Sequence, residues 1–403
     1  MLIKLALRNV LRQKVRTGMT LMAIVFGVAG LIVSGGFVAD IFVQLGEAII
    51  HSQTGHFQVF KRGYLEQGTR HPERFLIADP ARVAAQLEQT PEVSGVTARL
   101  SFSGLLNNGK RDLAIVGEGI EPRKEAQLGS YLSITAGRQL EDEDTFGMTV
   151  GQGVAQALGI APGDHVTLVM NTSGGALNTI DMSVIGVFQS FSKDFDARTV
   201  RIPLQAAQQL MLTQGANLLV VSLHRTEDTS PAHERLQAAL PEALDIRNWR
   251  QLSDFYDKTV QLYDRQFGIL QLIILAMVLL SVVNSVNMSV FERQSEFGTM
   301  LALGSRPPAI FRLLLVESTI LGIIGASLGV AVGIGVALGV SAIGIPMPPP
   351  PNANLGYVAF IRIVPTTIAV AFVIGLVATV LAAVFPARRV ASTQIVDALR
   401  QGV

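Results

Sequence analysis

The side chains best able to do chemistry in this 403-residue chain do not form a known catalytic pattern. The chain has no cysteine, which excludes thiol catalysis, cysteine-based zinc sites and disulfides together. Its six histidines are scattered, and the strings H-E-x-x-H and G-x-x-x-x-G-K-[ST] are absent. The acidic run from Glu141 to Asp144 lacks EF-hand spacing and is interpreted as a solvated loop. We therefore expect no catalytic residue, no metal site and no cofactor in this chain.

A second group of charged residues fills a short segment between two apolar stretches. Glu292, Arg293 and Glu296 stand at i, i+1 and i+4, so the two glutamates would share one face of a helix. Gly298 belongs to the same segment, and Gly304 would end the helix before two prolines start the next one. Such a helix could dock into a groove of a partner protein, or it could be a plain solvated turn. The residues alone leave both interpretations open.

Three of the polar residues within the apolar stretches are candidates for a functional role. Glu317 would stand at bilayer depth, where an acid is costly and usually partnered, and Arg312 could pair with it or snorkel. Glu317 is therefore either a functional residue or a static anchor at the interface. Asn284 and Asn287 are interpreted as hydrogen bonders between helices, with substrate contact as the alternative.

The elements that must position these residues include four membrane spans. Hydrophobic residues make up 49% of the chain and charged residues 16%, against about 25% charged in soluble proteins. This excludes a disordered protein and an ordinary cytosolic enzyme. Four segments reach the roughly 20 apolar residues that a span requires, at residues 17–43, 267–290, 310–343 and 366–386. The first is too long for the apolar region of a cleaved signal peptide, so we expect an uncleaved anchor.

Flanking positive charge orients these spans. Residues 1–16 carry five basic residues and no acidic one, and Arg388 and Arg389 follow the fourth span after Pro386. The positive-inside rule places residues 1–16, 291–309 and 387–403 in the cytoplasm, together with both termini. Residues 1–16 are amphipathic and would lie on anionic lipid at the inner surface. The net charge of +1 gives no reason to expect nucleic acid as a partner.

Residues 44–266 would then form a domain outside the cytoplasm. Short β-like runs alternate there with short helices, which predicts an α+β domain inserted between spans one and two. Residues 254–265 read as a helical stalk that continues into span two. Residues 344–365 form a short loop whose prolines, Pro348–Pro351, predict a stiff connector.

Span three has a repeated G-x-x-x-G pattern. Gly325, Gly329 and Gly333 would let another helix approach closely. The pattern indicates packing, either within the subunit or at a dimer seam.

With these features in place, the chain resembles the permease subunits of MacB/FtsX-like ABC transporters. Four strings carry the resemblance: Leu7–Arg12 (LRNVLR), Phe291–Gly304 (FERQSEFGTMLALG), Leu313–Glu317 (LLLVE) and the tail Phe385–Ala391 with Ile395–Arg400 (FPARRVA, IVDALR). The domain is most similar to the lipoprotein-releasing (Lol-type) permeases, through Gly55–Val59 (GHFQV) and the run Arg201–Leu204. As a departure, the turn Asn171–Asn178 is short and glycine-rich where those permeases can carry a long hairpin that recruits a chaperone.

The resemblance implies a role in mechanotransmission at the inner membrane. A separate cytoplasmic ABC ATPase dimer would bind ATP and Mg²⁺, and residues 291–309 would be its coupling helix. Two permease subunits, identical or sister chains, would pair, and a periplasmic chaperone or adaptor is a further implied partner. Lipoprotein or another lipid-linked or hydrophobic cargo would leave from the outer leaflet. The alternatives are an FtsX-like subunit that activates a cell-wall hydrolase without transport, and a four-span sensor without an ATPase.

Overall fold

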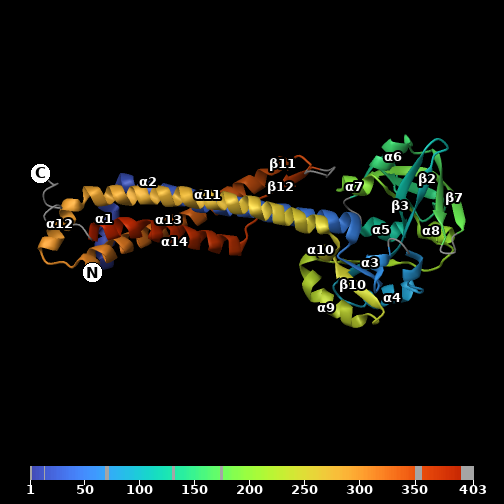
Figure 1. The fold of residues 1–403 in the computed structure, drawn as a ribbon, viewed down its shortest axis with the longest axis horizontal. Helices are drawn as coiled ribbons and strands as arrows, with labels where there is room; N and C mark the ends of the chain where they lie inside the picture. Colours follow the sequence, from blue (N-terminus) through green and yellow to red (C-terminus); the bar gives the residue numbers. More distant parts are fainter. Residues whose placement is uncertain are drawn as a thin grey trace. The chain divides into compact units, whose positions relative to one another are not determined.

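The computed structural model describes residues 2–12, 14–68, 72–128, 132–172, 176–349 and 356–391, and it divides into two compact units. The membrane unit contains residues 1–42, 259–346 and 358–403, and the inserted domain contains residues 43–258 and 347–357. Figure 1 labels their elements. The predicted string at 395–400, Pro350 and Pro351, and the centre of the turn at 173–175 lie outside the described residues.

The helices of the membrane unit confirm the four predicted spans. They are α1 (Leu2–Arg12), α2 (Lys14–Ile49), α11 (Asp254–Glu292), α12 (Gln294–Ala302), α13 (Pro307–Ile343) and α14 (Pro365–Ala391). Among the described residues, α2, α11, α13 and α14 are long and apolar enough to cross a membrane. The stalk at 254–265 is continuous with span two, as predicted. Helix α2 continues past residue 43 into a π-helical turn, η1 (Ile50–Thr54).

The glycine repeat of α13 packs against α2 of the same chain. A Cβ atom at Gly325 would lie 2.9 Å from Ile24 Cγ2, and one at Gly329 would lie 2.7 Å from Val28 Cβ. Gly333 meets Ala29 and Ile32 one turn further along. The absence of side chains therefore lets the two backbones approach, and the repeat lies within the subunit rather than at a dimer seam.

Two segments differ from the sequence prediction, the end of α14 and the loop that precedes it. Helix α14 continues through Pro386 to Ala391, so Arg388 and Arg389 are helical and exposed instead of starting a tail. Burial of Ala382, Ala383 and Ala387 against neighbouring helices holds the helix together where proline removes one backbone hydrogen bond. In the loop predicted as a plain connector, β11 (Ile345–Met347) pairs with β12 (Tyr357–Ala359).

The inserted domain is a mixed α+β fold, as predicted. Its strands are β1 (Phe57–Lys61), β2 (Val93–Asn107), β3 (Asp112–Ile120), β4 (Ser133–Gly137), β5 (Gly147–Gly151), β6 (His165–Asn171), β7 (Leu177–Gln189), β8 (Thr199–Pro203), β9 (Leu218–Leu223) and β10 (Leu244–Asn248). Its helices are α3 (Tyr64–Gln67), α4 (Pro80–Leu87), α5 (Pro122–Leu128), α6 (Gln152–Leu158), α7 (Lys193–Asp196), α8 (Leu204–Met211), α9 (Thr229–Ala239) and α10 (Trp249–Leu252), with 3₁₀ turns at Pro72–Phe75 and Thr226–Asp228.

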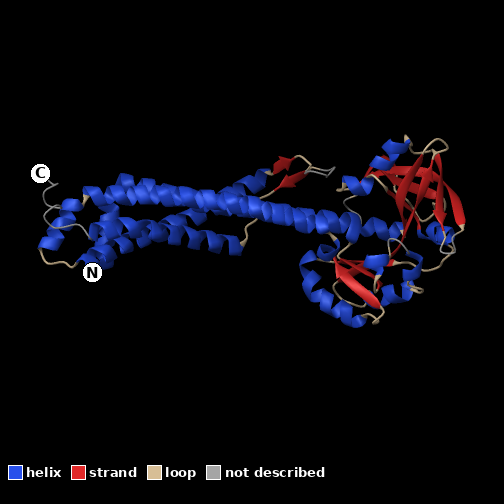
Figure 2. Ribbon diagram, viewed as in Figure 1, coloured by secondary structure: helices blue, strands red, loops and turns tan. Residues whose placement is uncertain are grey.

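The long strand β2 belongs to two halves of this domain. Its first part, Val93–Arg99, pairs with β9 in a four-stranded antiparallel sheet of order β10-β1-β9-β2. Its second part, Arg99–Asn107, pairs with β3, and the ring β2-β3-β8-β5-β7-β6 closes back on β2 as a six-stranded barrel. Each half has its own apolar core, and α4 and α9 cover the four-stranded sheet. Figure 2 shows the strands in these two groups.

The packing of α13 on α2 predicts a position-specific effect. Gly329→Val should destabilise the membrane unit by about 1–3 kcal/mol, because its side chain would overlap Val28 in a packed interface. Thermal unfolding of the purified chain in detergent measures this. Gly335→Val is the matched control, since a Cβ atom there has no neighbour within 4 Å. Equal melting temperatures for the two variants would contradict the packing.

Candidate functional site

The α12 loop, residues 291–306, begins where α11 breaks. The expected single helix through Glu292 and Glu296 is wrong: α11 ends at Glu292, and Arg293 leaves helical geometry with φ −104° and ψ 13°. Helix α12 follows, with Gly298 buried in it beside Phe297. Gly304 then adopts φ +91°, a conformation suited to glycine, and ends the segment as predicted.

Arg293 breaks the helix so that its guanidinium can lie between two carboxylates. Nη1 donates to Glu317 Oε2 at 2.8 Å, and Nε donates to Glu296 Oε2 at 3.1 Å. The Arg293 guanidinium also lies 5.0 Å from the ring centre of Phe297. Because Arg293 and Glu317 are both buried, each charge depends on the other for compensation.

Glu317 is therefore held by a residue distant in sequence. The ion pair with Arg312 that we considered does not occur among the described residues. Glu317 Oε1 instead accepts a hydrogen bond from Asn9 Nδ2 of α1 at 2.6 Å. An acid in the first turns of α13 thus joins α1, the α12 loop and α13.

Two exposed ion pairs extend this arrangement to the N-terminal helices. Arg12 pairs with Glu296, and Arg16 pairs with Glu292. Together with Arg293 and Glu317 these residues are here called the charge cluster, in which three cations meet three anions. Partial burial raises the pKa of Glu296, but hydrogen bonds from Arg12 and Arg293 outweigh this and lower it below the usual value. The carboxylate stays ionised near neutral pH.

The polar residues of α11 are placed differently from one another. Ser285 contacts Thr20 of α2, which is the expected type of interhelical hydrogen bond. Neither Asn284 nor Asn287 bonds to another helix among the described residues, and Asn284 is exposed. Asn284 lines a groove of about 800 Å³ between α2 and α11. Ser281 and Met288 line the same groove, together with the basic residues Arg12, Lys14 and Arg16.

One buried acid in α2 was missed by the sequence analysis. Asp40 is 1% exposed and accepts hydrogen bonds from the backbone N–H of Phe360 at 2.8 Å and from Arg362 Nε at 2.9 Å. It ties the segment before α14 to α2. A single aspartate within an apolar span was the signal that could have identified it.

Family models match nearly the whole chain. The MacB-like periplasmic core domain matches residues 17–239, and the FtsX-like permease C-terminal domain matches residues 268–395. The inserted domain and the last three spans therefore each have a family counterpart.

Individual relatives are distant. The lipoprotein-releasing system transmembrane protein LolE of Haemophilus influenzae is 22% identical over 61% of this chain and 61% of its own length. LolC of Neisseria meningitidis is 24% identical over 97% of each chain. The macrolide export ATP-binding/permease protein MacB of a Shewanella species is 24% identical over 82% of this chain and 51% of its own length. The chain thus spans less than two thirds of the first of these relatives.

Solved structures give weaker matches. The periplasmic region of MacB from Actinobacillus actinomycetemcomitans aligns with a TM-score of 0.37 and 16% identity, over 53% of this chain and 95% of that one. The extracellular domain of YknZ from Gram-positive bacteria aligns with a TM-score of 0.35 and 17% identity, over 48% and 99%. On the two family models, which together account for the inserted domain and the spans that follow it, the chain belongs to the MacB/FtsX-like ABC transporter permease family.

Proposed function

We propose that the chain couples ATP hydrolysis by a separate cytoplasmic ABC ATPase to the extrusion of lipoprotein or other hydrophobic cargo. The observation that carries this proposal is the charge cluster, which connects the α12 loop to α1, α2 and α13. The partner ATPase would bind ATP and Mg²⁺, because the sequence of this chain has no P-loop. The relatives named for lipoprotein release and macrolide export support a hydrophobic cargo.

The charge cluster suits a transmission role because its bonds reach several helices. Arg293 and Glu317 connect the α12 loop to α13 inside the unit, where breaking a buried ion pair is costly. Arg12 and Arg16 connect the same loop to α1 and α2. A displacement of α12 would therefore move these helices together. The coupling role expected of five residues is then to hold α12 in place. These residues are Glu292, Arg293, Glu296, Gly298 and Gly304.

The surface that meets the ATPase would be the exposed side of the same loop. Ser295 and Thr299 of α12 are exposed, and Leu303 is 83% exposed immediately after it. An apolar side chain at the tip of a charged loop suits insertion into a groove of a partner. The basic residues of 1–16, Arg388 and Arg389 support placing this loop and both termini in the cytoplasm.

A second permease subunit would cover the open face of α11. In the apolar window of α11 only 17% of residues are buried, and Gln271, Ser281 and Asn284 are exposed there. Polar side chains at bilayer depth are costly in contact with lipid and are usually partnered by another helix. This supports pairing through α11, by a sister chain or a second copy.

Leu303→Asp tests the ATPase contact. Because burial of a leucine stabilises by about 1.5–3 kcal/mol, the variant should bind the ATPase at least roughly tenfold more weakly. Co-purification and ATPase stimulation in proteoliposomes measure this. Leu212→Asn is the control, since Leu212 is an exposed leucine of the inserted domain with φ +54°. Unchanged binding by Leu303→Asp would contradict the proposed surface.

The transmission role of the charge cluster is tested by a single and a double variant. Glu317→Leu should cost about 3 kcal/mol of stability, because it leaves the Arg293 guanidinium buried without its main partner. Glu317→Leu with Arg293→Met should recover most of this loss in a thermal melt. We expect the double variant to fold and bind the ATPase but to lose ATP-driven cargo release. Full release by a folded double variant would show that the pair transmits nothing.

The pairing of permease subunits is tested at Asn284. A photo-crosslinking amino acid at this position should form an adduct with the mass of two permease chains, because the exposed face of α11 would meet the partner. The same amino acid at Leu338, on an exposed face of α13, is the control. Equal crosslinking at both positions, or none at Asn284, would argue against this seam.

A further inference from the structure

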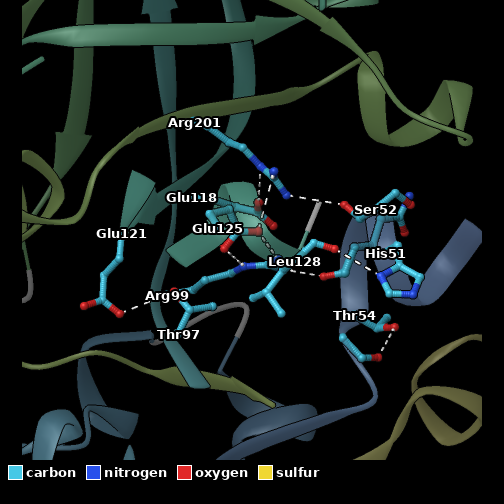
Figure 3. A network of polar contacts seen from close by, with 12 residues as sticks. His51, Ser52, Thr54, Thr97, Arg99, Glu118, Glu121, Glu125, Leu128 and Arg201 are labelled. Carbon is cyan, nitrogen blue, oxygen red and sulfur yellow. Dashed lines mark hydrogen bonds and ion pairs between the residues drawn. The ribbon is translucent and has the colours of Figure 1, made fainter. Parts of the chain in front are cut away.

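The end of α2 is held inside the inserted domain by two buried arginines. The last carbonyl groups of a helix have no partners within the helix. In the π-helical turn η1, which ends α2, the carbonyl of Gln53 accepts from Arg99 Nη1 and that of Ser52 accepts from Arg201 Nη2 at 3.4 Å. Figure 3 shows both guanidinium groups directed at this turn.

Glutamates compensate the charge of both arginines. Arg99 Nε donates to Glu125 Oε2 at 3.1 Å, and Arg99 Nη2 binds the other oxygen of the same carboxylate. Arg201 Nε donates to Glu118 Oε2 at 2.9 Å, and its Nη1 lies 3.6 Å from Glu125 Oε1. Burial raises the pKa of Glu125, but the adjacent Arg99 and Arg201 outweigh burial and lower it. Two cations and two anions thus form a neutral group in which all but the partly buried Glu118 are buried.

The two arginines lie on different strands of the inserted domain, Arg99 on β2 and Arg201 on β8. Arg99 stands at the point where β2 passes from the four-stranded sheet to the barrel: it is paired with Leu218 of β9 on one side and Ile120 of β3 on the other. Arg201 lies on β8 of the barrel, opposite Glu118 of β3. The end of α2 is therefore bonded at the junction of the two halves and, separately, to the barrel.

The other half of the domain holds the residues that follow η1. His56 Nδ1 accepts from the backbone N–H of Leu223 in β9 at 3.1 Å. The backbone N–H of Trp249 donates to the carbonyl of His56 at 3.0 Å, and the indole of Trp249 packs against Gly46 of α2. Both halves of the domain thus contact the last turns of α2 or the residues immediately after them.

Stability alone does not require three buried charges and a fourth, partly buried one at this point. Replacing a buried ion pair by apolar residues of similar volume is often neutral or stabilising. Apolar contacts have no direction, however, whereas a planar guanidinium donates along fixed lines and sets the angle between the groups that it joins.

We propose that Arg99 and Arg201 are positioning residues that fix the end of α2 to both halves of the inserted domain. A displacement of α2 then reaches the sheet and the barrel as one body. This inference rests on the proposed transport function, because it names the joint through which movement of a membrane helix would reach the inserted domain.

The test compares two double variants in the full-length chain. One changes the Arg99–Glu125 ion pair and is here called the joint variant, and the other is a matched control. Arg99→Met with Glu125→Leu removes the donor to Gln53 together with its main anion and replaces both by apolar side chains of similar volume, while Arg201 and Glu118 remain. Arg138→Met with Asp144→Leu removes an ion pair of the same domain, in which Arg138 Nη1 lies 2.6 Å from Asp144 Oδ2. Among the described residues, this pair makes no bond to α2. Since the chain has no native cysteine, spin labels at Val43→Cys on α2 and at Lys110→Cys, in the turn between barrel strands β2 and β3, report one distance.

We expect the joint variant to melt near the temperature of the wild type but to show a broader distribution of spin-label distances. The fraction of molecules in which the end of α2 is detached from the inserted domain should rise about tenfold. The control should keep the narrow distribution. An unchanged distribution in the joint variant would overturn the proposal. If the joint variant does not fold, Arg99→Lys, which keeps the charge but not the planar fork, is measured instead, and a width equal to that of the wild type would again overturn it.

A release assay with the partner ATPase separates this proposal from the proposed function. If wild-type chain releases cargo with ATP and the joint variant does not, while both bind the ATPase, the joint is supported. If wild type and joint variant release equally, the joint is wrong and the transport function stands. If the wild-type chain neither binds the ATPase nor releases cargo, the proposed function fails, and the distance measurement still decides whether the joint exists.

Discussion

The membrane unit depends on one buried cation, Arg293. Its guanidinium has to be compensated where little water is available, and Glu317 and Glu296 provide that compensation. This requirement explains why α11 ends where it does and why an acid stands in the first turns of α13. Asn9 bonds to the same acid and adds α1 to the group. The geometry around a single charge thus decides how the α12 loop is attached to the membrane helices.

Helix α2 shows the same principle along its length. Polar bonds hold its first turns, through Arg16 and Thr20, and Asp40 further along. Arg99 and Arg201 bond to the turn that ends it. Between these points the helix packs through apolar side chains against the glycines of α13. Directional bonds are therefore concentrated near the ends, where angles must be set, and non-directional packing fills the middle.

Local pattern predicted the parts of this structure that depend on local physics. The four spans followed from apolar length, the close packing of α13 from its glycine spacing, and the end of α12 from Gly304. The hydrogen bonds that hold the charge cluster and the end of α2 join residues far apart in the sequence. Glu317 bonds to Arg293, 24 positions away, and to Asn9, 308 positions away, and Arg99 bonds to Glu125 across 26 positions. No spacing rule connects such pairs, so the break at Arg293 and the arginine joint needed coordinates. Strands β4, β5 and β10 are only five residues long, and β5 is buried on both faces, so the sequence gives little local signal for them.

We propose that α12 is the surface through which an ATPase moves this permease. Because the chain has no cysteine, a single cysteine at Ser295, exposed on α12, can carry a short crosslinker. We expect this position to crosslink to the co-expressed ATPase in membranes, with a yield that changes when ATP binds. A cysteine at the exposed Lys110 of the inserted domain should give no adduct with the ATPase. Crosslinking to the ATPase from Lys110 but not from Ser295 would contradict the orientation and the coupling role together.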